Sequence, residues 1–119
     1  MGINKIKPIY NNLTKYWTDF VNPIAFWQHE YDKHLTCAKD VYPDPYILFY
    51  YGLQLREKYD IYNTLLNNNI YPSNEIKYNI QQIYDSIKQK YNVNTVATCI
   101  NTTILNQIIF CMTKNLTLY

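Results

Sequence analysis

The chain contains few of the residues that cross-link or loosen a small fold. Of its 119 residues only two are glycine, three are cysteine and two are histidine. An odd number of cysteines leaves at least one thiol unpaired within the chain, and their wide spacing gives no CxxC motif. The chain also lacks a run of roughly 18 apolar residues, which argues against a membrane span. Its start, MGINKIK, has no apolar segment of the kind found in a signal peptide.

Charge of one sign is also scarce. The formal net charge is +2 and the lysines are scattered, so charge alone gives no argument for nucleic-acid binding. Hydrophobic residues make up 48% and aromatic residues 17% of the chain, which is typical of a globular protein and not of a disordered one. The length predicts a single domain, residues 1–119.

The first two thirds of the chain have helical periodicity. Apolar residues recur at three- and four-residue steps from Ile6 to Phe20, and a helix from Ala25 to about Lys39 follows the break at Asn22-Pro23. Asp44 as cap and Pro45 as first residue predict a helix that runs to about Asn63. Ser73 predicts the start of another helix, over residues 74–90, in which the isoleucines form an amphipathic pattern. These are Ile76, Ile80, Ile83 and Ile87.

The C-terminal part has the composition of β-strands. Residues 93–100 and 104–112 are rich in β-branched side chains and flank Asn101-Thr-Thr, which predicts a hairpin. Helices followed by strands indicate an α+β fold, here mostly a helical half with a C-terminal β-hairpin. Because two strands alone make a poor sheet, we expect the hairpin to pair with another chain or to belong to an incomplete domain. If the sheet is incomplete, we expect an apolar patch beside residues 93–112 that is larger than a monomer normally exposes.

Titratable side chains are concentrated in FWQHEYDKHLTC, residues 26–37. On a helix, the spacing of three or four residues places Glu30 beside Lys33 and His34, and His29 beside Lys33. His29 and His34 are five residues apart, which on an α-helix separates them by roughly 140° and disfavours a zinc site of the HExxH kind.

Two interpretations of this face remain open from spacing alone. It can be an ordinary solvated helix face, with Glu30 and Lys33 as a weak surface ion pair. It can also serve phosphoryl chemistry, because Lys33 supplies positive charge, His29 can donate a hydrogen bond to phosphate and His34 can move a proton.

The segment FWQHEYDKHLTC resembles the second active-site motif of the T2 ribonucleases, FWxHEWxKHGTC. It differs at Tyr31, where the family has Trp, and at Leu35, where the family has Gly. Residues 50–73 are similar to the family segment of the form YFxxALxLxxxxNLxxxLxxxGIxPS, and residues 99–114 resemble its paired strands. With LTKYWTDF upstream, the resemblance covers roughly residues 9–114.

This resemblance implies an endoribonuclease that binds single-stranded RNA and cleaves it to 2′,3′-cyclic phosphate ends without a metal or other cofactor. His34 corresponds to the catalytic histidine and His29 to the one that contacts phosphate. Glu30 and Lys33 correspond to the pair that stabilises pentacovalent phosphorus. Trp27 corresponds to an aromatic position, for which we expect packing more than base stacking. Cys37, Cys99 and Cys111 are the candidate disulfide cysteines, and a rearranged Cys99–Cys111 bridge is one alternative pairing.

The sequence also departs from the family pattern. The family has another active-site motif, of the form HGLWP, whose histidine is the partner in acid–base catalysis, and no histidine precedes His29 here. We therefore expect a truncated, incomplete or degenerate T2-like domain with weak activity or none by itself. One alternative is a noncatalytic RNA-binding or protein-interaction module. Another is that a second polypeptide supplies the N-terminal strands and the missing histidine. Leu35 would strain the site or displace a neighbour if that position requires φ > 0 or close packing. The family resemblance implies a secreted or lysosomal/vacuolar location.

Overall fold

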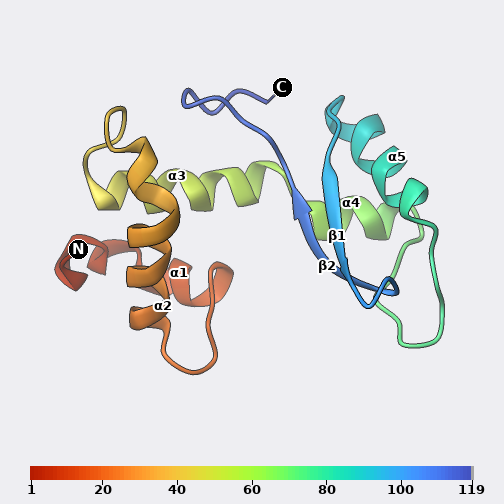
Figure 1. Cartoon of the computed structure of the whole chain (residues 1–119), viewed down its shortest axis with the longest axis horizontal. Coiled ribbons are helices and arrows are strands. Elements are labelled where there is room, and N and C mark those ends of the chain that lie inside the picture. Colours follow the sequence, from red (N-terminus) through yellow and green to blue (C-terminus); the bar gives the residue numbers. More distant parts are fainter. Residues whose placement is uncertain (119) are drawn as a thin grey trace. The chain divides into compact units, whose positions relative to one another are not determined.

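The computed structural model describes residues 1–118 and divides into two compact units, Met1–Tyr59 and Asp60–Tyr119. Helices dominate the first unit, and the second combines helices with one β-hairpin (Figure 1). The predicted α+β class is therefore confirmed. No helix among the described residues is both long enough and apolar enough to span a bilayer.

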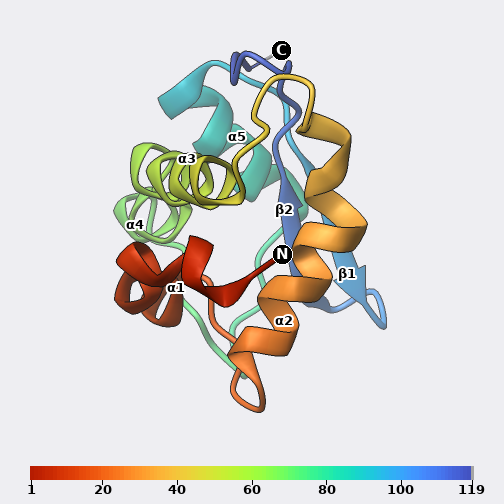
Figure 2. The ribbon, with the colours of Figure 1, turned by 90° about the vertical axis from the view of Figure 1, so that its left-hand side faces the viewer.

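The first unit is built on three α-helices: α1 (Tyr10–Tyr16), α2 (Pro23–Glu30) and α3 (Pro45–Lys58). α1 packs against α3, and the two helices lie side by side in Figure 2. As predicted, Asp44 caps α3, because its carboxylate accepts a hydrogen bond from the backbone N–H of Tyr46 at 2.9 Å. The unit encloses one core. Its buried residues are Ile6, Ile9, Leu13, Trp27, Tyr31, Leu48 and Phe49.

The N-terminal segment with helical periodicity forms helical turns followed by one short helix. Two 3₁₀ turns, Ile3–Lys5 and Lys7–Ile9, precede α1, and the helix stops at Tyr16. Beyond it, the Asp19 carboxylate accepts hydrogen bonds from the N–H groups of Val21 and Asn22. This local turn competes with helix formation, and Phe20 is consequently 96% exposed instead of buried.

The second unit contains α4 (Ile61–Asn67), α5 (Ile80–Tyr91), β1 (Val96–Ile100) and β2 (Ile104–Ile109). Its core consists of Ile70, Ile83 and Ile87, and Ile108 of β2 packs against this core from the hairpin. The predicted hairpin is confirmed, with β1 and β2 antiparallel and joined by a turn at residues 101–103. Asn101 and Thr102 both have positive φ, as the tight turns that suit a hairpin require.

Two predicted helix boundaries are wrong for the same physical reason. The helix predicted to reach Asn63 ends at Lys58, because Asp60 accepts a hydrogen bond from Asn63 N–H and begins α4 as a new helix. The helix predicted to start after Ser73 begins at Ile80, where Asn79 and Gln82 form a capping box. Ser73 accepts hydrogen bonds from the next residues without starting a helix. In each case the helix begins directly after the residue whose side chain caps its first turn, Asp60 for α4 and Asn79 for α5.

One face of the hairpin carries exposed apolar side chains. Val96 pairs with Ile109 and Ile100 pairs with Ile104, so these four side chains lie on one face of the sheet. Each of them is between 40% and 56% exposed. The opposite face contains Ile108, which packs against the core of the unit. One face of the hairpin thus contributes Ile108 to the core of its own unit, and the other is open.

Gly52 lies in the middle of α3 and allows α1 to approach it closely. A Cβ atom at this position would lie 2.6 Å from Cζ3 of Trp17. A helical Gly→Ala change ordinarily stabilises a protein by up to about 1 kcal/mol. Here we expect the opposite sign: Gly52→Ala should lower the free energy of unfolding by about 1–3 kcal/mol through overpacking, measured by urea denaturation.

Trp17→Phe provides the matched control for Gly52→Ala, because phenylalanine lacks the part of the indole ring that the new Cβ meets. The double variant should therefore recover part of the lost stability, giving a favourable coupling energy between the two positions. Gln54→Ala, at an exposed position of the same helix, should change stability little. A Gly52→Ala protein as stable as the parent would contradict the close packing of α1 on α3.

Candidate active site

The residues singled out in FWQHEYDKHLTC lie at the end of α2 and in the turn that follows. His29 and Glu30 are the last two residues of α2, and Lys33 and His34 belong to a π-helical turn, Tyr31–Leu35. His29, Lys33 and His34 are exposed, and Glu30 is half-buried. The local fold therefore presents these polar groups to solvent from one continuous helical segment.

The π-helical turn brings the two histidines together. The ring centroids of His29 and His34 are 5.8 Å apart and the rings meet edge to face, at an interplanar angle of 72°. The separation of roughly 140° expected from α-helical geometry is therefore wrong. A π-helix bonds residue i to residue i+5. Its wider turn therefore brings a side chain closer to the one five positions earlier than an α-helix does. No feature of the sequence marked this turn.

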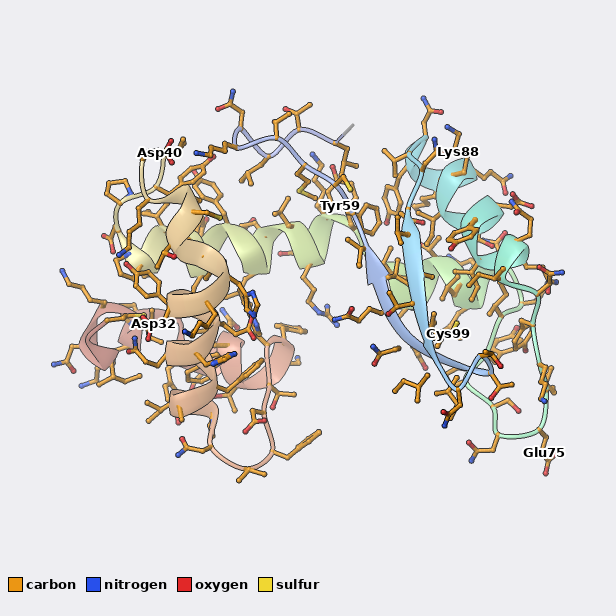
Figure 3. The ribbon with its side chains drawn as sticks, viewed as in Figure 1. Asp32, Asp40, Tyr59, Glu75, Lys88 and Cys99 are labelled. Atoms are coloured by element: carbon orange, nitrogen blue, oxygen red, sulfur yellow. The ribbon has the colours of Figure 1, made fainter. Side chains whose placement is uncertain are left out.

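Side-chain hydrogen bonds hold the turn at Asp32, which Figure 3 labels. Gln28 Nε2 donates to both carboxylate oxygens of Asp32, at 3.0 Å each. Thr36 Oγ1 donates to the carbonyl oxygen of Asp32 at 3.4 Å. No role was predicted for Gln28 or Asp32, and the signal in the sequence that could have indicated their contact is their spacing of four residues.

Glu30 and Lys33 do not form the surface ion pair that their spacing allows. Over residues 1–118, the structure contains no ion pair or hydrogen bond between these two side chains. Their carboxylate and ammonium groups are consequently available to a ligand. The same described residues contain no group of three or more His, Cys, Asp or Glu side chains placed to hold a metal ion.

Buried aromatic residues support the site from below. Trp27 has no exposed surface, and its Nε1–H donates a hydrogen bond of 2.7 Å to the carbonyl oxygen of Trp17. The Tyr10 ring meets Trp27 edge to face, with centroids 5.3 Å apart. The prediction that Trp27 serves packing is confirmed. Tyr31, at the start of the π-helical turn, is also buried. The segment from Trp27 to Tyr31, which carries His29 and Glu30, is therefore anchored in the core at both of its ends.

Leu35 does not strain the site. Its φ is −104°, in the ordinary right-handed region, and its side chain packs against the core of the first unit. Backbone strain from a positive φ at this position, one of the two expected causes, is therefore wrong.

All three cysteines have free, exposed thiols. Cys37 follows the π-helical turn, and Sγ of Cys37 is 3.6 Å from the carbonyl oxygen of His34. Cys99 lies on β1 (Figure 3), directly opposite Leu105. Cys111 is six residues beyond Leu105, a distance of roughly 20 Å along an extended chain. A disulfide needs Cα atoms within about 7 Å, so the rearranged Cys99–Cys111 bridge does not form.

Comparison with known proteins identifies the class. The family model of the Ribonuclease T2 family matches residues 2–119. The chain is 32% identical to ribonuclease Oy of Magallana gigas over 123 residues, 94% of this chain and 58% of that protein. It is 30% identical to ribonuclease T2 of Homo sapiens over 125 residues, 95% of this chain and 48% of that protein. The chain belongs to the ribonuclease T2 family.

Solved structures agree with the sequence matches. Human RNase T2 superposes with a TM-score of 0.91 at 29% identity, covering 100% of this chain and 65% of that chain. The RNase-related protein from Calystegia sepium gives 0.89 at 27% identity, covering 100% and 63%. A mutant of RNase MC1, 25% identical to this chain with a TM-score of 0.85, was solved in complex with 5′-UMP. The chain spans about half the length of the curated relatives it matches.

Proposed function

We propose that this chain is the part of a T2 endoribonuclease that binds single-stranded RNA and carries one half of its catalytic groups. The observation that carries the proposal is the close approach of His29 and His34 on an exposed face that also presents Glu30 and Lys33. Membership of the ribonuclease T2 family supports the substrate class. A secreted or lysosomal/vacuolar location is part of the same proposal.

In the proposed reaction the ribose 2′-oxygen loses its proton to a base and attacks the adjacent phosphorus. The bond from phosphorus to the 5′-oxygen then breaks, and an acid protonates that oxygen. The products are a 2′,3′-cyclic phosphate and a 5′-hydroxyl end. In this scheme His34 transfers a proton, His29 donates a hydrogen bond to a phosphate oxygen, and Lys33 with Glu30 stabilises the pentacovalent phosphorus.

The geometry limits what this chain does alone. In-line displacement places the attacking and leaving oxygens on opposite sides of phosphorus, so its two proton carriers must flank the phosphate. His29 and His34 lie in one helical segment with their ring centroids 5.8 Å apart, and therefore approach the phosphate from the same side. Loss of one acid or base typically lowers the rate by about 10²–10⁴-fold. We therefore propose weak or no cleavage by the isolated chain.

The direct test is to map the ends that the protein produces from a single-stranded RNA oligonucleotide. Termini with 2′,3′-cyclic phosphate and 5′-hydroxyl groups support the proposal, even at a low rate. RNA binding without any such ends would support the noncatalytic alternative instead. Cleavage that leaves 5′-phosphate ends would contradict the proposed chemistry.

We further propose that a second polypeptide, in β conformation, covers the open face of the hairpin and supplies the missing proton carrier. The exposed pairs Val96–Ile109 and Ile100–Ile104 support this, since a two-stranded sheet with one bare apolar face is marginal in water. A strand with alternating apolar residues has the chemistry to cover that face.

This partner is tested by mixing the chain with an N-terminal segment of a T2 ribonuclease that contains HGLWP. We expect the rate of cyclic-phosphate formation to rise by about 10²–10⁴-fold, since the second acid or base is restored. The control is the same segment with its HGLWP histidine replaced by alanine, which should bind without activating. Ile104→Lys, on the open face, should weaken the association. Activation that survives both changes would contradict the proposal.

A further inference from the structure

A second polar cluster of the first unit lies outside the FWQHEYDKHLTC motif. Lys15, in α1, and Arg56, in α3, both point to the ring of Tyr16. Lys15 Nζ lies 5.0 Å and Arg56 Cζ lies 4.4 Å from the ring centroid. Lys15 and Arg56 are exposed, and Tyr16 is 42% exposed. The packing of α1 on α3 therefore brings two cations from different helices to one ring.

Neither cation is neutralised by a carboxylate. In the described part of the chain, no ion pair involves Lys15 or Arg56. The negative face of an aromatic ring attracts cations, and this attraction accounts for the position of either Lys15 or Arg56 alone. One ring, however, is a weak counterpart for two full positive charges, which repel each other. An anion between the two side chains would relieve this repulsion.

We propose that Lys15, Tyr16 and Arg56 form a binding site for the phosphodiester backbone of single-stranded RNA, outside the catalytic motif. Arginine presents a planar fork that matches phosphate oxygens, and lysine adds a mobile point charge. The Tyr16 ring orders both cations before RNA arrives. The site rests on the proposed function for its substrate, and it extends the RNA contact to α1 and α3. It reads the backbone and is independent of base sequence.

The site is tested with a fluorescent 2′-O-methyl RNA oligonucleotide, which has no free 2′-hydroxyl and cannot be cleaved. Lys15→Gln combined with Arg56→Gln should weaken binding on the order of tenfold at low salt. It should also reduce the slope of log affinity against log salt by about 1.4, since each single-strand phosphate contact contributes about 0.7. Binding is measured by fluorescence anisotropy.

Lys88→Gln combined with Lys90→Gln is the matched control, because both lysines lie in α5 of the other unit and the same charge is removed. This variant should retain the parental affinity and slope. An equal loss in both double variants would show a general charge effect and overturn the proposal. Thermal unfolding of both variants checks that they fold, and Arg56→Lys, which keeps the charge, should retain the salt slope.

Two further outcomes separate this site from the catalytic proposal. His34→Ala should leave unchanged the factor by which Lys15 and Arg56 contribute to binding of the 2′-O-methyl oligonucleotide. If binding depends on these residues but no cyclic-phosphate ends form, the site stands and the catalytic function fails. If the double variant loses only the NMR shifts caused by inorganic phosphate and keeps RNA affinity, the site serves free phosphate and the RNA proposal is overturned.

Discussion

Replacing His34 by alanine is expected to lower the rate of cyclic-phosphate formation by about 10²–10⁴-fold, the typical contribution of one general acid or base. His34 is exposed at the end of the π-helical turn, and alanine removes its only proton-transferring group. The rate is measured on an RNA dinucleotide, with the chain alone and with the HGLWP segment added. The effect should be largest in the completed protein, where both proton carriers are present.

His29→Ala provides the comparison, because His29 lies beside His34 but is assigned to phosphate binding. We expect this variant to raise KM more than it lowers kcat, whereas His34→Ala lowers kcat. Both substitutions replace exposed side chains, so the free energy of unfolding should change little. Equal activity of the His34→Ala variant and the parent would contradict the assignment of His34.

Trp27→Ala is expected to lower the free energy of unfolding by about 3–5 kcal/mol, a large part of the stability of a small domain. Trp27 has no exposed surface and packs edge to face against Tyr10. Truncation would leave a cavity in the core and remove the hydrogen bond to the carbonyl oxygen of Trp17. Urea unfolding followed by circular dichroism measures the loss.

Trp27→Phe separates the two contributions, because it keeps an aromatic ring but has no N–H to donate. Leaving the carbonyl of Trp17 without its 2.7 Å hydrogen bond should cost about 1–3 kcal/mol. Tyr62→Ala, at a position 58% exposed in the other unit, should have an effect near zero. A Trp27→Ala protein with parental stability would show that this residue is not part of a cooperative core.

In the active-site segment, the residue types could be predicted from the sequence but the distances between them could not. The motif FWQHEYDKHLTC identified the family and the residues that carry the proposed chemistry, because residue types and spacing are local properties. The distance between His29 and His34 was not accessible in the same way. It depends on the π-helical turn, which begins at the buried Tyr31 and ends at Leu35, a partly buried residue that packs against the same core.

The helix boundaries follow a similar division. Asp44 with Pro45 predicted the start of α3 correctly, since a cap hydrogen-bonds within two residues of itself. Asp60 and Asn79 cap α4 and α5 by equally local hydrogen bonds. The apolar periodicity of the sequence continues across both residues, however, so it gave no sign of where one helix ends and the next begins. Where a helix stops depends on whether its next turn finds a core to pack against, and the exposed Ile76 shows that none was available there.

By itself the sequence determined the helical and hairpin segments, the T2 ribonuclease motif and the candidate site residues, because each follows from short-range periodicity or identity. Only the tertiary structure decided which groups meet: His29 with His34, Gly52 with Trp17, and Lys15 with Arg56 at Tyr16. It also decided that one apolar face of the hairpin stays open. These contacts join separate turns or helices, and their geometry depends on how the core packs, which no local pattern records.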